Sequence, residues 1–231
     1  MTRPIFVIGF VIAMLMSTKT AIVRAQETTE PGLAAQQARA GTRSKEPRRY
    51  HISLYRAKWA EMNLPSFPMR IVTFDIPMRP AYFVSLGGAY VLVPDFSLPL
   101  GLFDIDGCDL ELDGQVLKHF GLQSHVEGSF ALVFRTGDAD FWNLLHMNFA
   151  VGEGLSLAFA RPMYEKGPGG QRGLGSRRFQ NHLLFELEFT SPSASFFHLV
   201  FRLHHRSGIY GVISPQKTGS NYLGIGVRID G

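Results

Sequence analysis

A histidine and a serine lie two residues apart near the end of an alternating segment of the chain. In residues 195–207 apolar side chains occupy every second position, and His205 and Ser207 continue that apolar series. Because side chains in a strand alternate between two faces, both groups project from the apolar face. A histidine beside a serine hydroxyl has the chemistry of a general base and a nucleophile that attack an ester. We therefore take His205 and Ser207 as candidate catalytic residues.

The same spacing has a second interpretation. The apolar series before the pair consists of Phe197, Leu199, Phe201 and Leu203. If the strand leaves an apolar surrounding at residue 204, His205 and Ser207 simply contact water or lipid headgroups. Since His-x-Ser is a weak pattern by itself, the elements that position the pair must decide between the two.

Alternation of apolar and polar residues dominates the chain from residue 50 onward, whereas helical spacing of apolar residues hardly appears. The expected strands are 50–60, 81–93, 108–119, 124–136, 145–160, 179–190, 195–207 and 220–229. Several match the roughly 9–11 residues that cross a bilayer at a tilt. Their polar faces suit the interior of a narrow barrel, which side chains fill. The sequence predicts an all-β fold, an eight-stranded antiparallel up-and-down transmembrane β-barrel. A soluble lipocalin-like barrel or a sandwich is the alternative.

Loop lengths predict which end of this barrel faces outward. The connections 61–80, 161–178 and 208–219 follow odd-numbered strands and are long, as expected at the outer rim of an outer-membrane barrel. Two connections break the rule, because 94–107 reads as a long loop at the inner rim and 120–123 as a short one at the outer rim. The seventh strand then ends at the outer rim, which places the His–Ser pair near the outer leaflet.

The start of the chain is predicted to be an export signal. Arg3 gives it a positive start, residues 5–16 are almost wholly apolar, and Val23 to Ala25 resemble a small-residue cleavage site. This run is too short for a membrane helix, which needs about 20 residues, and no later segment reaches that length. A membrane location therefore requires a closed barrel. The expected organisation is a signal peptide at 1–25, a disordered N-terminal segment at 26–46 and the barrel domain at 47–231.

Charge and cysteine content limit the partners. The chain has 23 Lys and Arg against 19 Asp and Glu, and loss of Arg3, Lys19 and Arg24 with the signal peptide leaves 20 bases. A nearly neutral mature chain gives no electrostatic reason to bind nucleic acid. The single cysteine, Cys108, excludes an intrachain disulfide, so an exported chain depends on its core or on lipid for stability. The sequence leaves the oligomeric state open.

The signal peptide, the eight strands and a His-x-Ser-Gly at the end of the seventh strand resemble the lipid A 3-O-deacylases of the PagL type, a family often labelled acyloxyacyl hydrolase. Most of the resemblance lies in residues 203–229, from Leu-His-His-Arg-Ser-Gly into the last hairpin. It implies a barrel in the outer membrane of a Gram-negative-type bacterium that removes an ester-linked acyl chain from lipid A of lipopolysaccharide, without metal or cofactor. By match, Ser207 is the nucleophile and His205 the base.

One feature departs from the family, whose acid is expected on the outward face of the last strand. The outward positions here are Gly219, Asn221, Leu223, Ile225 and Val227. Because none is a carboxylate, Asn221 is the third candidate catalytic residue. It can hold the imidazole in one tautomer, but it cannot offset the imidazolium charge. Glu153 lies two strands from His205, about 10 Å away, and would contribute only through a bulge at Gly152 or Gly154.

Because the expected acid is missing, an alternative function from another class stays open. In this alternative the chain is a non-enzymatic outer-membrane barrel with a structural or adhesion role, and the His–Ser pair is a relict. A third group within hydrogen-bond reach of His205 would separate the two.

Further polar residues have expected places. His182, His198 and His204 fall on inward faces among glutamates and arginines, and we expect them to form the ionic filling of the barrel and not a metal site. At the outer rim, four basic residues are expected to pair with lipid A phosphates, namely Lys166, Arg172, Arg177 and Arg178.

Overall fold

The computed structural model describes residues 49–101, 104–167, 170–171 and 175–231. The expected signal peptide at 1–25 and the expected disordered segment at 26–46 lie outside the described residues, and both stay predictions. The candidate residues of the last hairpin all lie within the described part of the chain.

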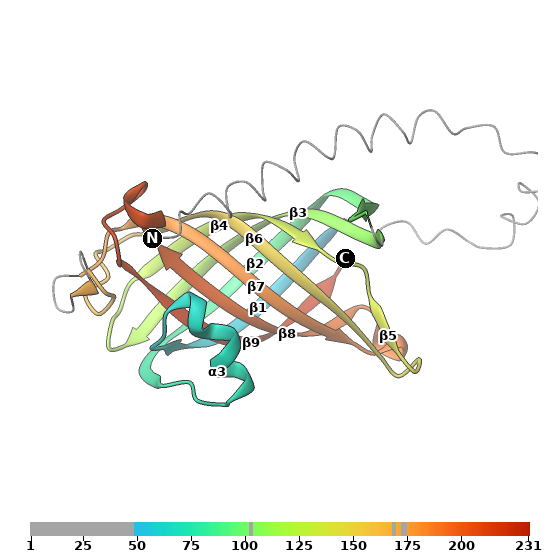
Figure 1. Ribbon diagram of the computed structural model, residues 1–231, viewed down its shortest axis with the longest axis horizontal. Helices are drawn as coiled ribbons and strands as arrows, with labels where there is room; N and C mark the ends of the chain where they lie inside the picture. The colour runs from blue at the N-terminus through green and yellow to red at the C-terminus, as the bar shows by residue number, and fades with distance from the viewer. Residues whose placement is uncertain (1–48, 102–103, 168–169, 172–174) are drawn as a thin grey trace, which may run out of the picture. The chain divides into compact units, whose positions relative to one another are not determined.

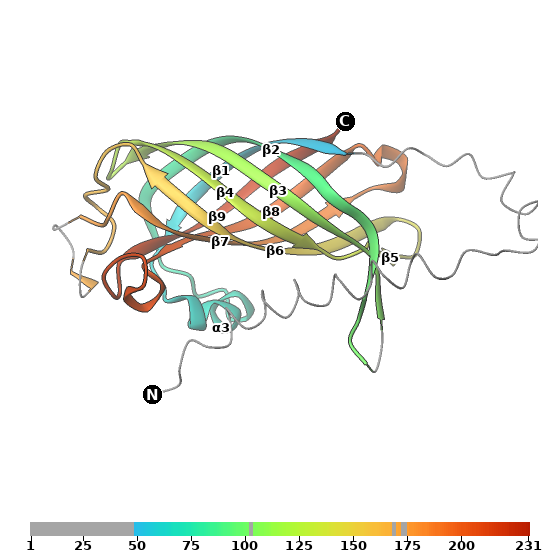
Figure 2. The same cartoon turned by 90° about the horizontal axis from the view of Figure 1, so that it is seen from above.

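The described residues contain nine strands in one antiparallel sheet, which curls into a barrel (Figures 1 and 2). They are β1 (Tyr50–Ala60), β2 (Met78–Pro99), β3 (Asp104–Gly121), β4 (Val126–Arg135), β5 (Ala139–Phe141), β6 (Leu145–Ala158), β7 (Phe179–Thr190), β8 (Phe197–Ser207) and β9 (Gly219–Asp230). Strand β1 pairs with β9, and β4 pairs with β6, so eight strands close a ring. The short β5 pairs with β6 and stands outside that ring. The predicted eight-stranded up-and-down barrel is confirmed.

The two faces of each strand have opposite character. In β8 the outward Leu199 and Phe201 are 38% and 44% exposed, whereas the inward Arg202 and His204 are 5% and 0% exposed. Burial alternates in the same way along β1 and β3. The barrel therefore presents apolar side chains outside and buries polar ones inside, which argues against the soluble alternative, since such a wall needs an apolar surrounding.

The connections divide the barrel into two ends. We call the end where β1, β3, β6 and β8 finish the loop end; its connections are 61–77, 122–125, 159–178 and 208–218. We call the opposite end the turn end; its connections are 100–103, 136–144 and 191–196, with β5 inside the second. Both His205 and Ser207 lie at the loop end of β8.

The prediction of a long loop at 94–107 is wrong, because β2 and β3 continue there as a hairpin that projects from the turn end. Phe96 pairs with Cys108 and Leu98 with Ile105. Register shifts between Val91 and Leu98 interrupt the alternation, and bulges of this kind hide a strand from a period-two search. With the hairpin counted, the connection at the turn end shrinks to 100–103, and this exception to the loop rule disappears.

Segment 61–77, which the alternation left as a loop, folds against the outside of the barrel. It contains the 3-10 turn η1 (Leu64–Ser66) and the short helix α3 (Phe67–Val72). Figure 1 shows α3 beside β8 and β9. Leu64, Phe67 and Ile76 pack against a buried cluster of Ala60, Met62 and Leu203. We call residues 61–77 the roof segment. In the described part of the chain no helix has the length and apolar character to cross a membrane.

Charged and imidazole side chains fill the interior in two groups. Near the turn end lies the arginine network, made of Arg135, Arg202, Arg228, Asp113, Glu111, Glu186 and Glu188. Near the loop end lies the histidine cluster, made of His119, His125, His182, His204 and Glu127. Phe83 and Tyr222 pack against the rings of that cluster. The expected ionic filling of the interior is present.

Candidate active site

The three candidate catalytic residues lie on neighbouring strands at the loop end. Strands β8 and β9 pair so that His205 is opposite Asn221 and Ser207 is opposite Gly219. All share the outward parity of the exposed Phe201. A hydrogen bond of 2.6 Å joins His205 Nδ1 and Asn221 Oδ1. The register of the β8–β9 hairpin thus brings the imidazole and the amide together.

The backbone of the roof segment determines how the Asn221 amide is oriented. Asn221 Nδ2 donates to the carbonyl oxygen of Met62 at 2.6 Å. Because that carbonyl can only accept, the amide nitrogen must face Met62 and the amide oxygen must face the imidazole. His205 Nδ1 therefore carries the hydrogen, and Nε2 keeps its lone pair. An imidazole in this tautomer is ready to act as a base through Nε2.

The roof segment also buries this part of the outer wall. Leu203, two residues before His205 on the same face, is 2% exposed although Phe201 is 44% exposed. Asn221 is 6% exposed, while His205 and Ser207 are half-buried. The His–Asn pair therefore lies under cover, where its hydrogen bond competes little with water.

Ser207 lies beside the imidazole on the same strand face, without a direct bond to it. Within the described residues the hydrogen bond of the His205 ring is the one to Asn221, and Ser207 Oγ has none to either ring nitrogen. Catalytic hydrogen bonds are often loose without substrate and tighten when it binds, so this geometry leaves the pair as a candidate. The catalytic roles of Ser207, His205 and Asn221 stay predictions.

Gly208, directly after Ser207, is required by a close backbone approach. A Cβ at this position would collide with the carbonyl oxygen of Ser214. The Gly208 carbonyl accepts hydrogen bonds from the amides of Gly211 at 3.1 Å and Ile213 at 3.1 Å. This tight turn fixes the backbone that follows the candidate nucleophile.

The outward face holds a carboxylate, but not within reach of His205. Glu153 is paired with Leu183, which is paired with His205, so two strand spacings separate Glu153 from the imidazole, about 10 Å. The register runs without a shift through Gly152 and Gly154. The bulge that would have brought Glu153 to His205 is absent from β6, and that hypothesis is wrong.

Asn181 is a site residue that the sequence reasoning missed. It lies outward on β7, directly opposite Ser207, and is 5% exposed. Its side chain interacts with the Glu153 carboxylate. The alternation could have identified it, because Asn181 is a polar residue on the same strand face as the apolar Leu183 and Phe185. Asn181 adds an amide beside the candidate nucleophile, with Glu153 behind it.

A basic cleft of about 570 Å³ lies at the loop end, next to the outward residues just described. Its lining residues are Arg161, Ser176, Arg177, Arg178, Phe179, Ile213, Ser214 and Pro215. Phe179 lies two residues before Asn181 on the outward face of β7, so the cleft adjoins the candidate site. Arg177 and Arg178 were expected at the rim, Arg161 was not, and Arg172 lies outside the described residues.

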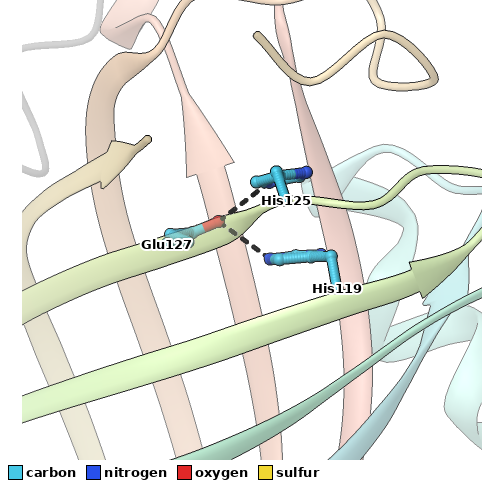
Figure 3. A group of neighbouring side chains, drawn as sticks. All are labelled: His119, His125 and Glu127. Carbon is cyan, nitrogen blue, oxygen red and sulfur yellow. Dashed lines mark hydrogen bonds and ion pairs between the residues drawn. The ribbon is translucent and has the colours of Figure 1, made fainter. Parts of the chain in front are cut away.

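The structure brings together a second set of chemically capable side chains inside the barrel. His119, His125 and Glu127 each offer one ligand atom, and these atoms lie within 4.8 Å of one another (Figure 3). The inward alternation gave no signal of this set, because it depends on which strands are neighbours. His198 is ion-paired with Glu188, as expected for ionic filling, but neither ring nitrogen of His182 has a hydrogen-bond partner among the described residues.

Comparisons with known proteins bear on the fold. No protein-family model matches the chain, and no curated protein matches it. Among solved structures, the outer membrane enzyme PagL is similar at 14% identity and a TM-score of 0.51, over 78% of this chain and 98% of that one. The N-terminal β-barrel domain of Pseudomonas aeruginosa OprF has 11% identity and a TM-score of 0.38, over 80% of this chain and 98% of that one. The likeness to PagL shows that the chain has the fold of an outer-membrane β-barrel.

Proposed function

We propose that this chain is an outer-membrane serine esterase that removes an ester-linked acyl chain from lipid A of lipopolysaccharide. Ser207 is the nucleophile, His205 the general base, and Asn221 the residue that orients His205. The observation that carries the proposal is the 2.6 Å hydrogen bond between His205 and Asn221, with the amide held in turn by the Met62 carbonyl. A relict pair on a bare wall would need neither the covered position nor the amide support.

The proposed reaction transfers the acyl group first to Ser207 and then to water. Ser207 Oγ attacks the ester carbonyl carbon while His205 Nε2 takes the hydroxyl proton. The bond between the carbonyl carbon and the sugar oxygen then breaks, and His205 returns the proton to that oxygen. Water, activated by His205, releases the fatty acid from Ser207. Because Asn221 cannot offset the charge of the imidazolium, we expect slow turnover.

The barrel wall supports a membrane location for this chemistry. Outward apolar residues such as Ile52, Leu86 and Val116 are 57%, 62% and 62% exposed. The shortest strand of the ring, β4, has 10 residues, which is enough to cross a bilayer at a tilt. Long connections cluster at the loop end, which is the outer side in barrels of this kind. His205 and Ser207 then lie near the headgroups of the outer leaflet, where the ester bonds of lipid A are found.

The basic cleft supports a phosphorylated substrate. Arg161, Arg177 and Arg178 are exposed in its wall, next to the outward face that holds Ser207. Guanidinium groups bind phosphate oxygens through paired hydrogen bonds. We infer that this cleft holds a lipid A phosphate and so sets which acyl chain reaches Ser207.

The test is acyl release from purified lipid A by the refolded barrel, followed by mass spectrometry. We expect loss of one hydroxyacyl chain, and at least about a 1,000-fold lower rate in Ser207→Ala. The matched control is Ser193→Ala, which removes the hydroxyl of an exposed serine at the turn end and should leave the rate unchanged.

A specific observation favours the rival, a non-enzymatic barrel. No hydrogen bond joins Ser207 to His205 in the described residues, and no carboxylate lies beside the ring. If the folded barrel releases no acyl chain, the covered His–Asn pair is a structural contact that attaches the roof segment to the wall.

A further inference from the structure

Imidazoles from three parts of the chain gather around one carboxylate inside the loop end. His119 comes from the end of β3, His125 from the connection 122–125, and His204 from β8. The carboxylate is that of Glu127 at the start of β4, and all four side chains are at most 1% exposed. Figure 3 shows His119 and His125 directed toward the same carboxylate.

The spacing of the ligand atoms suits a small divalent cation. His119 Nε2 is 3.0 Å from Glu127 Oε2, and His125 Nε2 is 3.9 Å from the same oxygen. Zinc bonds of about 2.0–2.1 Å in a tetrahedron put neighbouring ligand atoms about 3.4 Å apart, between these two values. The two contacts to Glu127 need shifts of about half an ångström to match this spacing. The two imidazole nitrogens lie within 4.8 Å of each other on nearly parallel rings, so one ring must also rotate before both nitrogens face a common ion.

Unpartnered nitrogen atoms in the same place point to a ligand. Neither ring nitrogen of His125 has a hydrogen-bond partner among the described residues, and Nδ1 of His119 has none. The two rings stack with centroids 4.1 Å apart and planes inclined by 10°. Burying a polar nitrogen without a partner costs about 1–3 kcal/mol, and a ligand bound to His125 would remove that cost.

The local charge favours a cation as that ligand. Arg206 is paired with both oxygens of Glu165 at 2.7 and 2.8 Å, whereas its nearest approach to Glu127 is 3.5 Å. One arginine therefore balances two buried carboxylates, which leaves one negative charge if the imidazoles are neutral. A buried negative charge without a counter-ion is strongly unfavourable.

We propose that His119 Nε2, His125 Nε2 and a carboxylate oxygen of Glu127 bind a divalent transition metal of the zinc class. The metal would join β3, β4 and their connection at the loop end. It would lie inside the barrel, whereas His205 and Ser207 lie on the opposite face of the wall, so its role is to stabilise the loop end and not to take part in ester hydrolysis.

The first experiment measures metal binding by the full barrel, refolded without a histidine tag and stripped with a chelator. We expect one equivalent of Co²⁺ to bind and give the visible absorption of a tetrahedral nitrogen and oxygen site, and Zn²⁺ to displace it. The zinc X-ray absorption spectrum should show nitrogen and oxygen ligands at about 2.0–2.1 Å. Zn²⁺ should also raise the unfolding temperature of the unmodified barrel.

Variants separate this site from general histidine binding. His125→Gln should weaken Zn²⁺ binding at least about 100-fold, and His119→Gln should do the same. The matched control is His182→Gln, which removes a buried imidazole of the same cluster outside the proposed ligand set and should keep the affinity. A folded, unmodified barrel that binds neither Co²⁺ nor Zn²⁺ in molar excess overturns the proposal, as does a folded His125→Gln barrel with unchanged affinity. The spectrum of the unmodified barrel needs no variant, so a variant that fails to fold leaves the test intact.

Discussion

At the turn end of the barrel interior, each arginine of the network contacts at least two carboxylates. Arg135 lies 2.9 Å from Glu111, 2.8 Å from Glu186 and 3.2 Å from Glu188. At the loop end, by contrast, imidazoles crowd around one glutamate, and neither ring nitrogen of His125 has a hydrogen-bond partner within the described residues. At the turn end the charged side chains pair with one another, as expected of a buried ionic network that stabilises the barrel.

The loop end also differs on the outside of the wall. Near the turn end the outward side chains of β8 are exposed apolar residues such as Leu199, whereas near the loop end they are the half-buried His205 and Ser207, which follow Leu203 beneath the roof segment. The loop end thus combines the imidazole cluster inside the barrel with the His–Ser pair on the outer face. We infer that the arginine network at the turn end stabilises the barrel, whereas the outer face of the loop end carries the proposed activity.

The largest effect is expected at the outer face of the loop end. His205→Gln should lower the rate of acyl release by about 10²–10⁴-fold, because the general base is lost. The free energy of unfolding should change by less than about 1 kcal/mol, since the side chain is half-buried outside the interior networks. Acyl release and urea unfolding measure the two quantities. A variant that unfolds more easily but retains its rate would assign His205 to structure.

A substitution at the turn end should have the opposite signature. Arg135→Met removes the shared partner of Glu111, Glu186 and Glu188, and it should cost about 3–5 kcal/mol of unfolding free energy because buried carboxylates lose their counter-ion. The rate of acyl release per folded molecule should stay the same. Arg135→Lys, which keeps the charge, is the control and should lose less stability. If the Arg135→Met barrel is as stable as the unmodified barrel, the arginine network does not stabilise the fold.

A smaller effect is expected at Asn221. Asn221→Ala removes one hydrogen bond to the imidazole and should lower the rate about tenfold. Asn221→Asp should be faster than Asn221→Ala, because a carboxylate can stabilise the imidazolium. The comparison requires kcat for both variants on the same lipid A preparation. If the two variants have the same kcat, the contact with Asn221 does not orient a base.

Glu153 should give the smallest effect. Glu153→Gln keeps the shape of the side chain and an oxygen atom for Asn181, and Glu153 lies two strands from His205. We expect less than about a threefold change in the rate of acyl release. A loss of about 100-fold or more would mean that the carboxylate reaches the imidazole when substrate binds.

The fold was predictable where alternation is regular. Strands β1, β7 and β8 follow the period-two pattern closely, and their expected bounds differ from the observed ones by at most two residues. The pattern failed at 94–107, where bulges shift the register of β2, and in the roof segment, whose short helix is held by contacts with distant strands. Local patterns do not record such contacts.

The candidate site was predictable only in part for the same reason. Parity within one hairpin is enough to put His205, Ser207 and Asn221 on one face. The Met62 carbonyl, by contrast, reaches Asn221 from 159 positions away in the sequence. The histidine cluster needs the closed ring, because His204 of β8 meets Glu127 of β4 across the interior. Interactions of that separation become visible once the register of the whole barrel is known.

Covalent labelling of the folded barrel with a fluorophosphonate, followed by peptide mass spectrometry, tests most directly whether Ser207 is an activated nucleophile. An activated serine attacks the phosphorus atom and retains the adduct, whereas an ordinary serine does not. We predict one adduct, on Ser207, that forms at least about 100-fold more slowly in His205→Gln and is absent in Ser207→Ala. An unlabelled Ser207, or an adduct that forms at the same rate without His205, would contradict the account.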